Sequence, residues 1–436
     1  MRALMLGLWC LGLAGATPLA ANDFTTLKGH GGPIMGLAVQ PDTGQVASAS
    51  FDNSVGLWQG RAPRWFEGHR AAVISLEYLD ARKLISGGDD FAVILWDMDT
   101  GQSTRLEGHQ GKIAALDVSP DGAWIASASW DGAIGIWPAT GGAPRFLRGH
   151  DAAVSDVAFS ADGQLLYSSS ADGTVREWRW QDEGAPPRVV ANQGFGINRI
   201  VLGPEDGWLA YGAVDGATRV IDPATGDEIA DFTLERRPIL ALEHHAGTGQ
   251  LAAGDGQGYI MVIDTLAWKI ARDFRAMNNG PVWALAFSPD GQTIYAGGLS
   301  EVVYGWPVEL LGDYDPAGEE DHSFLRPAEE MDNGERQFMR KCSICHALTP
   351  PPSRKAGPTL YGLFGRRAGT VPGYAYSRTL GGSDIVWSED TIDALFDLGP
   401  DHYIPGSKMP MQRITAAQDR QDMIDYLREA TAKREN

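Results

Sequence analysis

Short segments in which hydrophobic and polar residues alternate, separated by tight turns, occupy the chain from about residue 24 to residue 308. Residues 123–129 (AWIASAS) and 133–137 (AIGIW) are typical. Their period of two predicts strands, and the Asp131-Gly132 pair between them predicts a hairpin turn. The pattern returns about every forty residues. Short strands and turns repeated at this spacing indicate a β-propeller rather than a sandwich.

Four of the copies carry the same two markers. A Gly-His pair opens each copy, and a turn Asp is followed six residues later by a Trp. Three weaker copies continue the rhythm around Asp215, Asp255 and Asp290. This stretch resembles the WD-repeat family over roughly residues 24–308, and seven copies imply a seven-bladed propeller with four strands in each blade.

The resemblance also implies that a His, a Ser, the Asp and the Trp form a buried hydrogen-bonded set within a blade. The second copy departs, with Gly88 at the position expected for the serine. The alternative is that these histidines bind metal or act in catalysis, but the repeat explains them as satisfied core groups. The expected sets are His30, Ser50, Asp52 and Trp58; His109, Ser129, Asp131 and Trp137; and His150, Ser170, Asp172 and Trp178.

The two ends of this region predict how the ring closes. Residues 23–27 form a strand before the first Gly-His pair, without a blade of their own. Residues 282–287, 293–297 and 302–306 form the three inner strands of the last copy. The first strand should therefore complete the seventh blade and remove the open sheet edges.

A different pattern follows the repeats. Residues 313–333 hold eight Asp and Glu against one Arg, among prolines and glycine, which predicts an exposed acidic linker over 309–333. Helical periodicity then predicts helices over 334–341, from Ser388 to Gly399, and from a capping box of Thr415 and Gln418 onward. The chain is thus expected to be multidomain, with an all-β propeller over 23–308 and an all-α domain over 334–436.

The first residues have the pattern of a targeting segment. Arg2 precedes an apolar stretch over 3–13 that is too short to cross a bilayer, and small residues follow it. We expect residues 1–21 to be a signal peptide, the mature protein to lie in the periplasm, and no membrane span to remain after cleavage. A membrane anchor is the alternative.

The charge distribution limits the partners. The chain of 436 residues has a net charge of −20, of which residues 1–312 carry −15, whereas residues 334–436 carry +2. An acidic body argues against nucleic acid or an anionic membrane surface as the natural partner. Once Cys10 leaves with the signal peptide, only Cys342 and Cys345 remain, so a disulfide framework is excluded.

The remaining chemistry lies in residues 342–346, Cys-Ser-Ile-Cys-His. Two thiols at this spacing can each add to one vinyl group of a haem, and His346 directly after them can reach the iron. A redox-active dithiol and half of a zinc site are the alternatives. The first lacks a thioredoxin-like context, and the second lacks two further ligands.

Residues 334–433 resemble the class I cytochrome c family, in particular its mitochondrial-type branch. The matching motifs are 357–360 (GPTL), 363–366 (LFGR), 372–376 (PGYAY), Trp387 and 403–409 (YIPGSKM). The resemblance implies one covalently bound haem c with Met409 as the second axial ligand, Met411 being the competitor. It also implies haem contacts by Pro358, Arg366, Tyr376, Trp387 and Lys408. Leu380, where this branch usually has Asn, is a departure beside Met409.

An iron held by His and Met has no vacant position, so we expect an electron carrier rather than an enzyme. Lys408, Arg354, Lys355 and Arg413 are expected to ring the haem edge and steer an acidic redox partner, ordinary solubility being their alternative role. The propeller is expected to be a scaffold for a protein partner. The alternatives are an enzymatic or ligand-binding propeller coupled to the haem, and a haem sensor or peroxidase from which Met409 dissociates.

Overall fold

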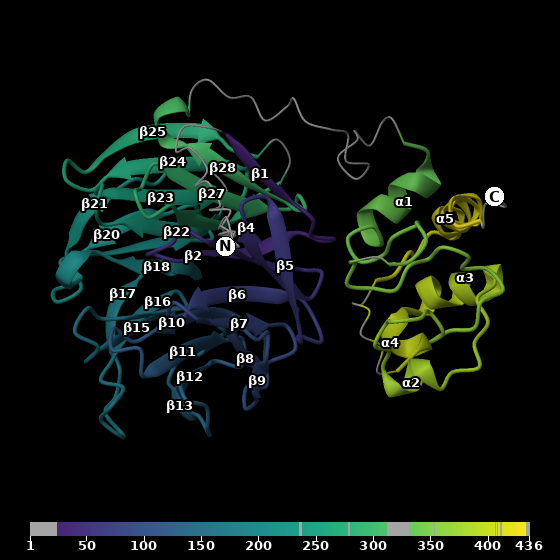
Figure 1. The fold of residues 1–436 in the computed structure, drawn as a ribbon, viewed down its shortest axis with the longest axis horizontal. Coiled ribbons are helices and arrows are strands. Elements are labelled where there is room, and N and C mark those ends of the chain that lie inside the picture. Colours follow the sequence, from purple (N-terminus) through teal and green to yellow (C-terminus); the bar gives the residue numbers. More distant parts are fainter. Residues whose placement is uncertain are drawn as a thin grey trace, which may run out of the picture.

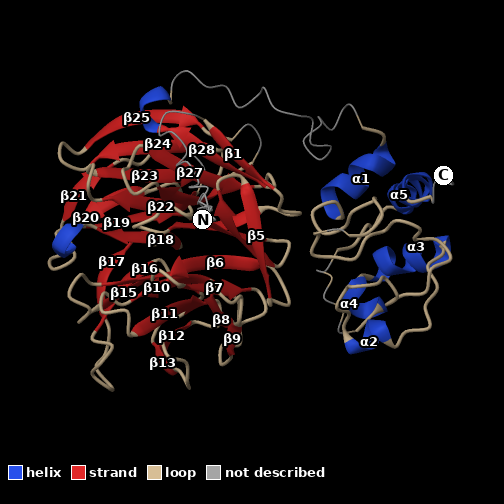
Figure 2. Ribbon diagram, viewed as in Figure 1, coloured by secondary structure: helices blue, strands red, loops and turns tan. Residues whose placement is uncertain are grey.

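The computed structural model describes residues 24–234, 238–277, 280–311, 331–352, 354–405, 407, 409 and 412–432. Figures 1 and 2 show two bodies, a ring of strands and a smaller group of helices. The expected signal peptide, most of the expected linker, Lys408 and Met411 lie outside the described residues.

Within the described residues, 28 strands pair into seven antiparallel sheets of four strands, which confirms the seven-bladed propeller. Blade 1 contains β2 (Ile34–Val39), β3 (Val46–Ser50), β4 (Ser54–Gln59) and β5 (Ala62–Glu67). Blade 2 contains β6 (Val73–Tyr78), β7 (Lys83–Gly88), β8 (Val93–Asp97) and β9 (Ser103–Leu106). Blade 3 contains β10 (Ile113–Val118), β11 (Trp124–Ser129), β12 (Ala133–Pro138) and β13 (Arg145–Arg148). Blade 4 contains β14 (Val154–Phe159), β15 (Leu166–Ser170), β16 (Thr174–Trp178) and β17 (Arg188–Asn192). Blade 5 contains β18 (Ile197–Leu202), β19 (Leu209–Ala213), β20 (Thr218–Ile221) and β21 (Glu228–Asp231), with the 3-10 turn η1 (Pro204–Asp206). Blade 6 contains β22 (Ile239–His245), β23 (Gln250–Asp255), β24 (Tyr259–Asp264) and β25 (Lys269–Arg275). Blade 7 contains β26 (Val282–Phe287), β27 (Thr293–Gly298), β28 (Val302–Pro307) and β1 (Thr25–Lys28), followed by η2 (Val308–Leu310).

The ring closes as the sequence predicted. Strand β1 pairs with β28 in antiparallel register, from Thr25 opposite Gly305 to Lys28 opposite Val302. Leu27 is only 2% exposed and belongs to a cluster that joins blade 7 to blade 1. The last blade is therefore built from both ends of the propeller sequence, and its outer strand is supplied by the first strand of the chain.

The hydrophobic core lies mainly between neighbouring blades. One cluster joins Phe66 and Val55 of blade 1 to Leu76 and Leu84 of blade 2, and comparable clusters link the other neighbours. Each sheet buries both faces against its neighbours, so the blades hold one another in place.

A hydrogen-bonded set staples each of the first four blades, but its serine is not the one predicted. In blade 3, His109 Nδ1 lies 2.8 Å from Asp131, and His109 Nε2 lies 2.8 Å from Ser127 Oγ. Trp137 Nε1 donates to the same Ser127 oxygen at 2.8 Å. Ser129 donates instead to the carbonyl of Gly111. The assignment of Ser129 was wrong. The assignments of Ser50 and Ser170 were also wrong, because Ser48 and Ser168 bind the His and the Trp in their blades.

Strand register explains the difference. Ser127 lies opposite Gly135, two residues before Trp137, so the indole can lean back over the glycine to reach the hydroxyl. A Cβ at Gly135 would come within 2.6 Å of Ser127 Oγ and 2.7 Å of Trp137 Nε1, so a larger residue there would displace the set. Blade 2 has the complete set as well, because Ser86 binds both His69 and Trp96. The predicted departure at Gly88 was therefore wrong.

The helical domain contains α1 (Asn333–Lys341), α2 (Arg378–Gly381), α3 (Glu389–Leu398), α4 (Pro400–Tyr403) and α5 (Ala417–Ala430). The predicted first helix and the Ser388 start are confirmed, since Ser388 Oγ accepts the Thr391 N–H. The predicted capping box of Thr415 and Gln418 is wrong. Helix α5 begins after Ala416 without a side-chain cap, and Gln418 donates to Asp422 instead. Within the described residues, no helix is long and apolar enough to cross a membrane.

Two residues placed in the linker by composition pack into cores. Leu311 is 4% exposed in a propeller cluster, and Met331 is 8% exposed in the core of the helical domain. Both are apolar residues next to the acidic stretch, and burying them removes apolar surface from water.

Candidate functional site

One turn at the end of α1 presents the two thiols and the imidazole together. The Cys342 N–H donates to the carbonyl of Phe338, which ends the helix, and the N–H groups of Cys345 and His346 both donate to the Cys342 carbonyl. Cys342 is buried and Cys345 is half-buried. Burial raises the pKa of both thiols above the ordinary cysteine value. A redox-active dithiol requires a lowered thiol pKa, so this alternative finds no support in the site.

The His346 ring is oriented by one hydrogen bond. Its Nδ1 lies 2.7 Å from the Pro358 carbonyl oxygen, which can only accept, so Nδ1 carries the proton. Burial lowers the pKa of His346, which favours the neutral ring. The Nε2 lone pair is then free for a metal ion, as in histidine ligands oriented by a carbonyl. A Cβ at Gly357 would lie 2.5 Å from the His346 ring, so glycine lets this loop approach.

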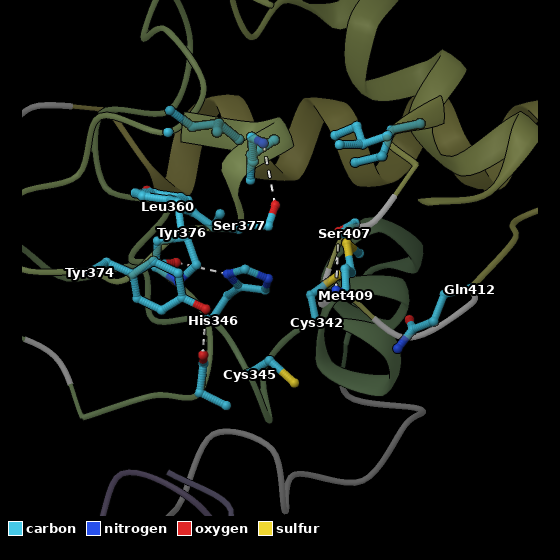
Figure 3. A pocket seen from close by; sticks show the side chains of 18 of the residues that line it. Cys342, Cys345, His346, Leu360, Tyr374, Tyr376, Ser377, Ser407, Met409 and Gln412 are labelled. Carbon is cyan, nitrogen blue, oxygen red and sulfur yellow. Dashed lines mark hydrogen bonds between the residues drawn. The ribbon is translucent and has the colours of Figure 1, made fainter. Parts of the chain in front are cut away.

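Met409 reaches the same cavity from a different segment, between α4 and α5. Its backbone N–H donates to Ser407 Oγ, and the segment returns to the domain where the Ile414 N–H donates to the carbonyl of Phe396 at the end of α3. Figure 3 shows the Met409 and His346 side chains across the cavity from one another, with Cys342 beside Met409 and Cys345 below the His346 ring in this view. The sequence places these residues more than sixty positions apart.

The other predicted haem contacts also line this cavity. Arg366 donates to the carbonyls of Tyr361 and Thr359 at 2.7 and 2.8 Å, which holds its guanidinium in place. Burial lowers the pKa of Arg366. The Tyr376 hydroxyl accepts the Val371 N–H at 3.2 Å. Pro358 and Trp387 line the cavity as well, whereas Lys408, the fifth predicted contact, lies outside the described residues.

The sequence interpretation missed several lining residues. Tyr374 lies inside a motif used for the resemblance, and its hydroxyl donates to the Ala356 carbonyl, but no role was assigned to it. Gln412 had no signal in its sequence context. More surprisingly, Phe51, Asn53 and Asp89 of the propeller line the same cavity, and no pattern within the repeats could have indicated this.

The cationic residues expected around the haem edge do not all face outward. The Arg354 guanidinium lies over the Trp65 ring, 4.1 Å from its centre, and Lys355 pairs with Glu301. Arg413 donates to the Asp397 carbonyl within its own domain. The expectation that Arg354 and Lys355 stand ready for an external partner is therefore wrong for this arrangement, because the propeller itself supplies their partners.

The residues present fit haem c. The cavity has a volume of about 250 Å³ and combines apolar walls, including Leu363, Leu395 and Phe396, with two thiols and the His346 Nε2 lone pair. Three buried oxygens at this cavity, Asn53 Oδ1, Asp89 Oδ1 and Gln412 Oε1, have no hydrogen-bond partner among the described residues. Protein side chains thus leave room and polar groups for a further molecule, and the donor set matches covalent haem attachment.

Comparison with known proteins supports both parts of the chain. Residues 331–431 match the family described as cytochrome c. Residues 22–59, 61–97, 101–138, 143–179 and 268–306 match the family described as WD domain, G-beta repeat. The stretch between the last two segments contains all of blade 5 and the first three strands of blade 6, the two blades that lack the His and Trp markers.

Three curated relatives cover the helical domain. Cytochrome c of Sesamum indicum is 44% identical over 107 residues, which are 24% of this chain and 95% of that protein. Cytochrome c of Chlamydomonas reinhardtii is 40% identical over 106 residues, 24% of this chain and 94% of that protein. Cytochrome c of Theileria parva is 40% identical over 107 residues, 24% of this chain and 91% of that protein. The helical domain therefore carries covalently bound haem c, and the chain belongs to the cytochrome c family, with a WD-repeat propeller preceding its cytochrome c domain.

Proposed function

We propose that this protein is a periplasmic carrier of single electrons, with His346 and Met409 as the axial iron ligands and the propeller as a protein-interaction scaffold. The observation that carries the proposal is the geometry of His346 and Met409. The Pro358 carbonyl leaves the His346 Nε2 lone pair free, and Met409 lies on the opposite side of the same cavity. The bound haem supplies an iron that changes between the ferrous and ferric states.

The chain's own groups support electron transfer over substrate chemistry. His346 and Met409 together would fill both axial positions, and the buried side chains of Leu363, Leu395 and Phe396 give the site an apolar lining. Because such a centre changes little between its two oxidation states, the protein needs only to hold its ligands and admit a partner.

The four marker histidines of the propeller are unsuited to catalysis. In blades 1 to 4, both ring nitrogens of the marker histidine are hydrogen-bonded within the blade, to Asp at Nδ1 and to Ser at Nε2. They hold strands together and have no nitrogen left for a substrate. The enzymatic propeller is therefore the less favoured alternative.

Exposed aromatic residues support the scaffold role. Trp130 is 57% exposed and Phe195 is 58% exposed. Trp130 lies in the turn between the second and third strands of its blade, and Phe195 in the loop that enters the first strand of the next blade. In antiparallel blades these turns and loops share one end of the ring. Exposed aromatic side chains gathered at one face are typical of protein-binding surfaces.

Spectroscopy of the purified holoprotein tests the ligands. We expect the ferric protein to show thioether-to-iron charge-transfer absorption, which Met409→Ala abolishes and Met411→Ala, the matched control, leaves intact. Met409→His should lower the midpoint potential by on the order of 0.1 V, since axial ligands tune potentials over about 0.8 V. Rapid carbon monoxide binding by the reduced wild type would contradict the proposal and favour the sensor alternative.

Export is tested separately. We expect the mature protein to fractionate with periplasmic markers and to begin close to residue 22, as read by N-terminal sequencing. A cytoplasmic protein that retains Met1 would contradict the periplasmic location, and it would also remove the compartment in which haem attachment was expected.

A further inference from the structure

The wall of the haem cavity is shared between the two domains. Phe51 and Asn53 lie in the turn between β3 and β4, and Asp89 lies in the turn after β7. These propeller residues line the same cavity as Cys345 and His346. One end of blades 1 and 2 therefore contributes part of the cavity lining, beside the residues of the cytochrome c domain.

Among the described residues, Arg354 and Lys355 of the cytochrome c domain make ion pairs with the propeller. Arg354 Nη1 lies 3.1 Å from Glu67 Oε1, and its guanidinium stacks on Trp65. Lys355 pairs with Glu301 in the turn between β27 and β28 of blade 7. The same segment continues into the cavity lining at Ala356 and Gly357. The contact is thus directly connected to the haem site.

The fit is close at the backbone. A Cβ at Gly31 would lie 2.2 Å from the Arg354 carbonyl oxygen, so only glycine allows the approach. The Trp65 ring that receives Arg354 also contacts the ring of His30, at 4.7 Å between centres. The docking face, defined as Gly31, Phe51, Asn53, Trp65, Glu67 and Glu301, therefore rests on the hydrogen-bonded set of blade 1.

The contact combines a partly exposed ion pair, Arg354–Glu67, with a less exposed one, because the Lys355 and Glu301 side chains are only 16% and 23% exposed. Glu67 is 69% exposed at its side chain, and exposed ion pairs and cation–π contacts contribute little in water. Interfaces of this kind between domains usually permit relative motion. The covalent connection keeps the local concentration high, so a weak contact can still be populated.

We propose that the docking face is an intramolecular binding surface for the haem edge of the chain's own cytochrome c domain. It takes the place of an acidic redox partner, covers the cavity in the docked state, and must be displaced before an external protein can use that edge. The proposal rests on the electron-transfer function proposed above. Salt, which screens the Arg354 and Lys355 pairs, shifts the protein toward the undocked state.

Charge reversal on the propeller tests the docking in the full-length holoprotein. Glu67→Lys with Glu301→Lys should enlarge the radius of gyration at low salt, measured by small-angle X-ray scattering. It should also speed haem reduction by neutral hydroquinone about three- to tenfold, as expected for losing two modest charge contacts. High salt should bring the wild type to the same values.

The matched control is Glu107→Lys, because Glu107 precedes the next Gly-His pair as Glu67 precedes its own, and its ion-pair partner is Arg105 within the propeller. A variant that exchanges the two charges, Arg354→Glu combined with Glu67→Arg, should have the compact shape and the slow rate of haem reduction seen in the wild type.

The docking proposal is overturned if the double variant matches the wild type in shape and rate, or if Glu107→Lys has an equal effect. In each case an unchanged haem spectrum and intact Met409 ligation would leave the electron-transfer function standing, so the two failures are distinguishable.

Discussion

At the scale of single residues, Ser127 shows how one hydroxyl connects two strands of blade 3. The pKa of Asp131 lies below its ordinary value because hydrogen bonds from Gln110 and His109 outweigh its burial, so the carboxylate accepts the His109 Nδ1–H. His109 Nε2 must then accept the Ser127 hydroxyl proton, and Ser127 accepts the Trp137 N–H. Each hydrogen bond in the set therefore has only one possible assignment of donor and acceptor.

Removing this hydroxyl should destabilise the propeller. Ser127→Ala leaves the fully buried Trp137 N–H and His109 Nε2 without partners, at a cost of about 2–4 kcal/mol. Ser129→Ala removes bonds only at a turn and should cost about 1 kcal/mol. Urea unfolding followed by tryptophan fluorescence measures both. Equal losses would mean that Ser127 is not the centre of the set.

At the scale of strands, the innermost ones carry carboxylates toward the centre of the ring. Asp117 on β10 accepts the Phe159 N–H of the next blade at 2.6 Å. Burial raises the pKa of Asp117 and of Glu77 on β6 to about 7. Burial, with Glu77 and Asp156 nearby, raises the pKa of Glu243 on β22 to about 8. These groups keep their protons in the folded state at pH values where the unfolded chain has lost them.

The stability of the propeller should therefore depend on pH in a defined direction. The pKa of Glu243 is about 8 when folded against an ordinary 4.5, so its contribution is complete below pH 4.5 and is lost as the pH rises to 8. Glu243→Gln should be more stable than wild type by about 2 kcal/mol at pH 9 and nearly equal at pH 5. Urea unfolding at both pH values checks this. Glu183→Gln, at an exposed position, is the control; no gain at pH 9 for Glu243→Gln would refute the assignment.

The closing strand offers a second test at this scale. Leu27 on β1 is 2% exposed and packs between blades 7 and 1, so Leu27→Ala should cost about 2–4 kcal/mol. Leu266, which is 88% exposed, provides the control, and Leu266→Ala should change stability by less than about 0.5 kcal/mol. Thermal unfolding compares them. Similar midpoints for the two variants would show that β1 adds little to ring closure.

At the scale of the whole molecule, an acidic propeller carries a near-neutral haem domain and touches it through residues beside the haem site. Arg354 and Lys355 have the charge that a cytochrome uses toward an acidic partner, and in this chain they meet Glu67 and Glu301. In the docking and scaffold proposals, the propeller both shields the haem edge and presents exposed aromatic residues to other proteins. Binding of another protein to the propeller and access to the haem would then be coupled through this one contact between the domains.

Much of the fold could be predicted from the amino-acid sequence. Strand alternation, the Gly-His and Asp–Trp spacing and the first strand's position led to the seven blades and their closure, because each signal is local. The capping box at Thr415 failed since the helix begins at Ala417 instead, and Gln418 finds a partner within the helix. The serine assignments failed because Ser127 and Ser129 lie on the same face of one strand, and only cross-strand register distinguishes them.

The sequence by itself determined the repeat architecture and the haem-binding motif at 342–346, since strand periodicity and the spacing of two thiols and a histidine are properties of consecutive residues. Only the tertiary structure decided that Ser127 serves His109 and Trp137, that propeller residues line the cavity of His346, and that Arg354 lies against Trp65. These outcomes depend on register and on packing between segments far apart in the chain. No local pattern encodes which surfaces will meet when two folded domains are joined.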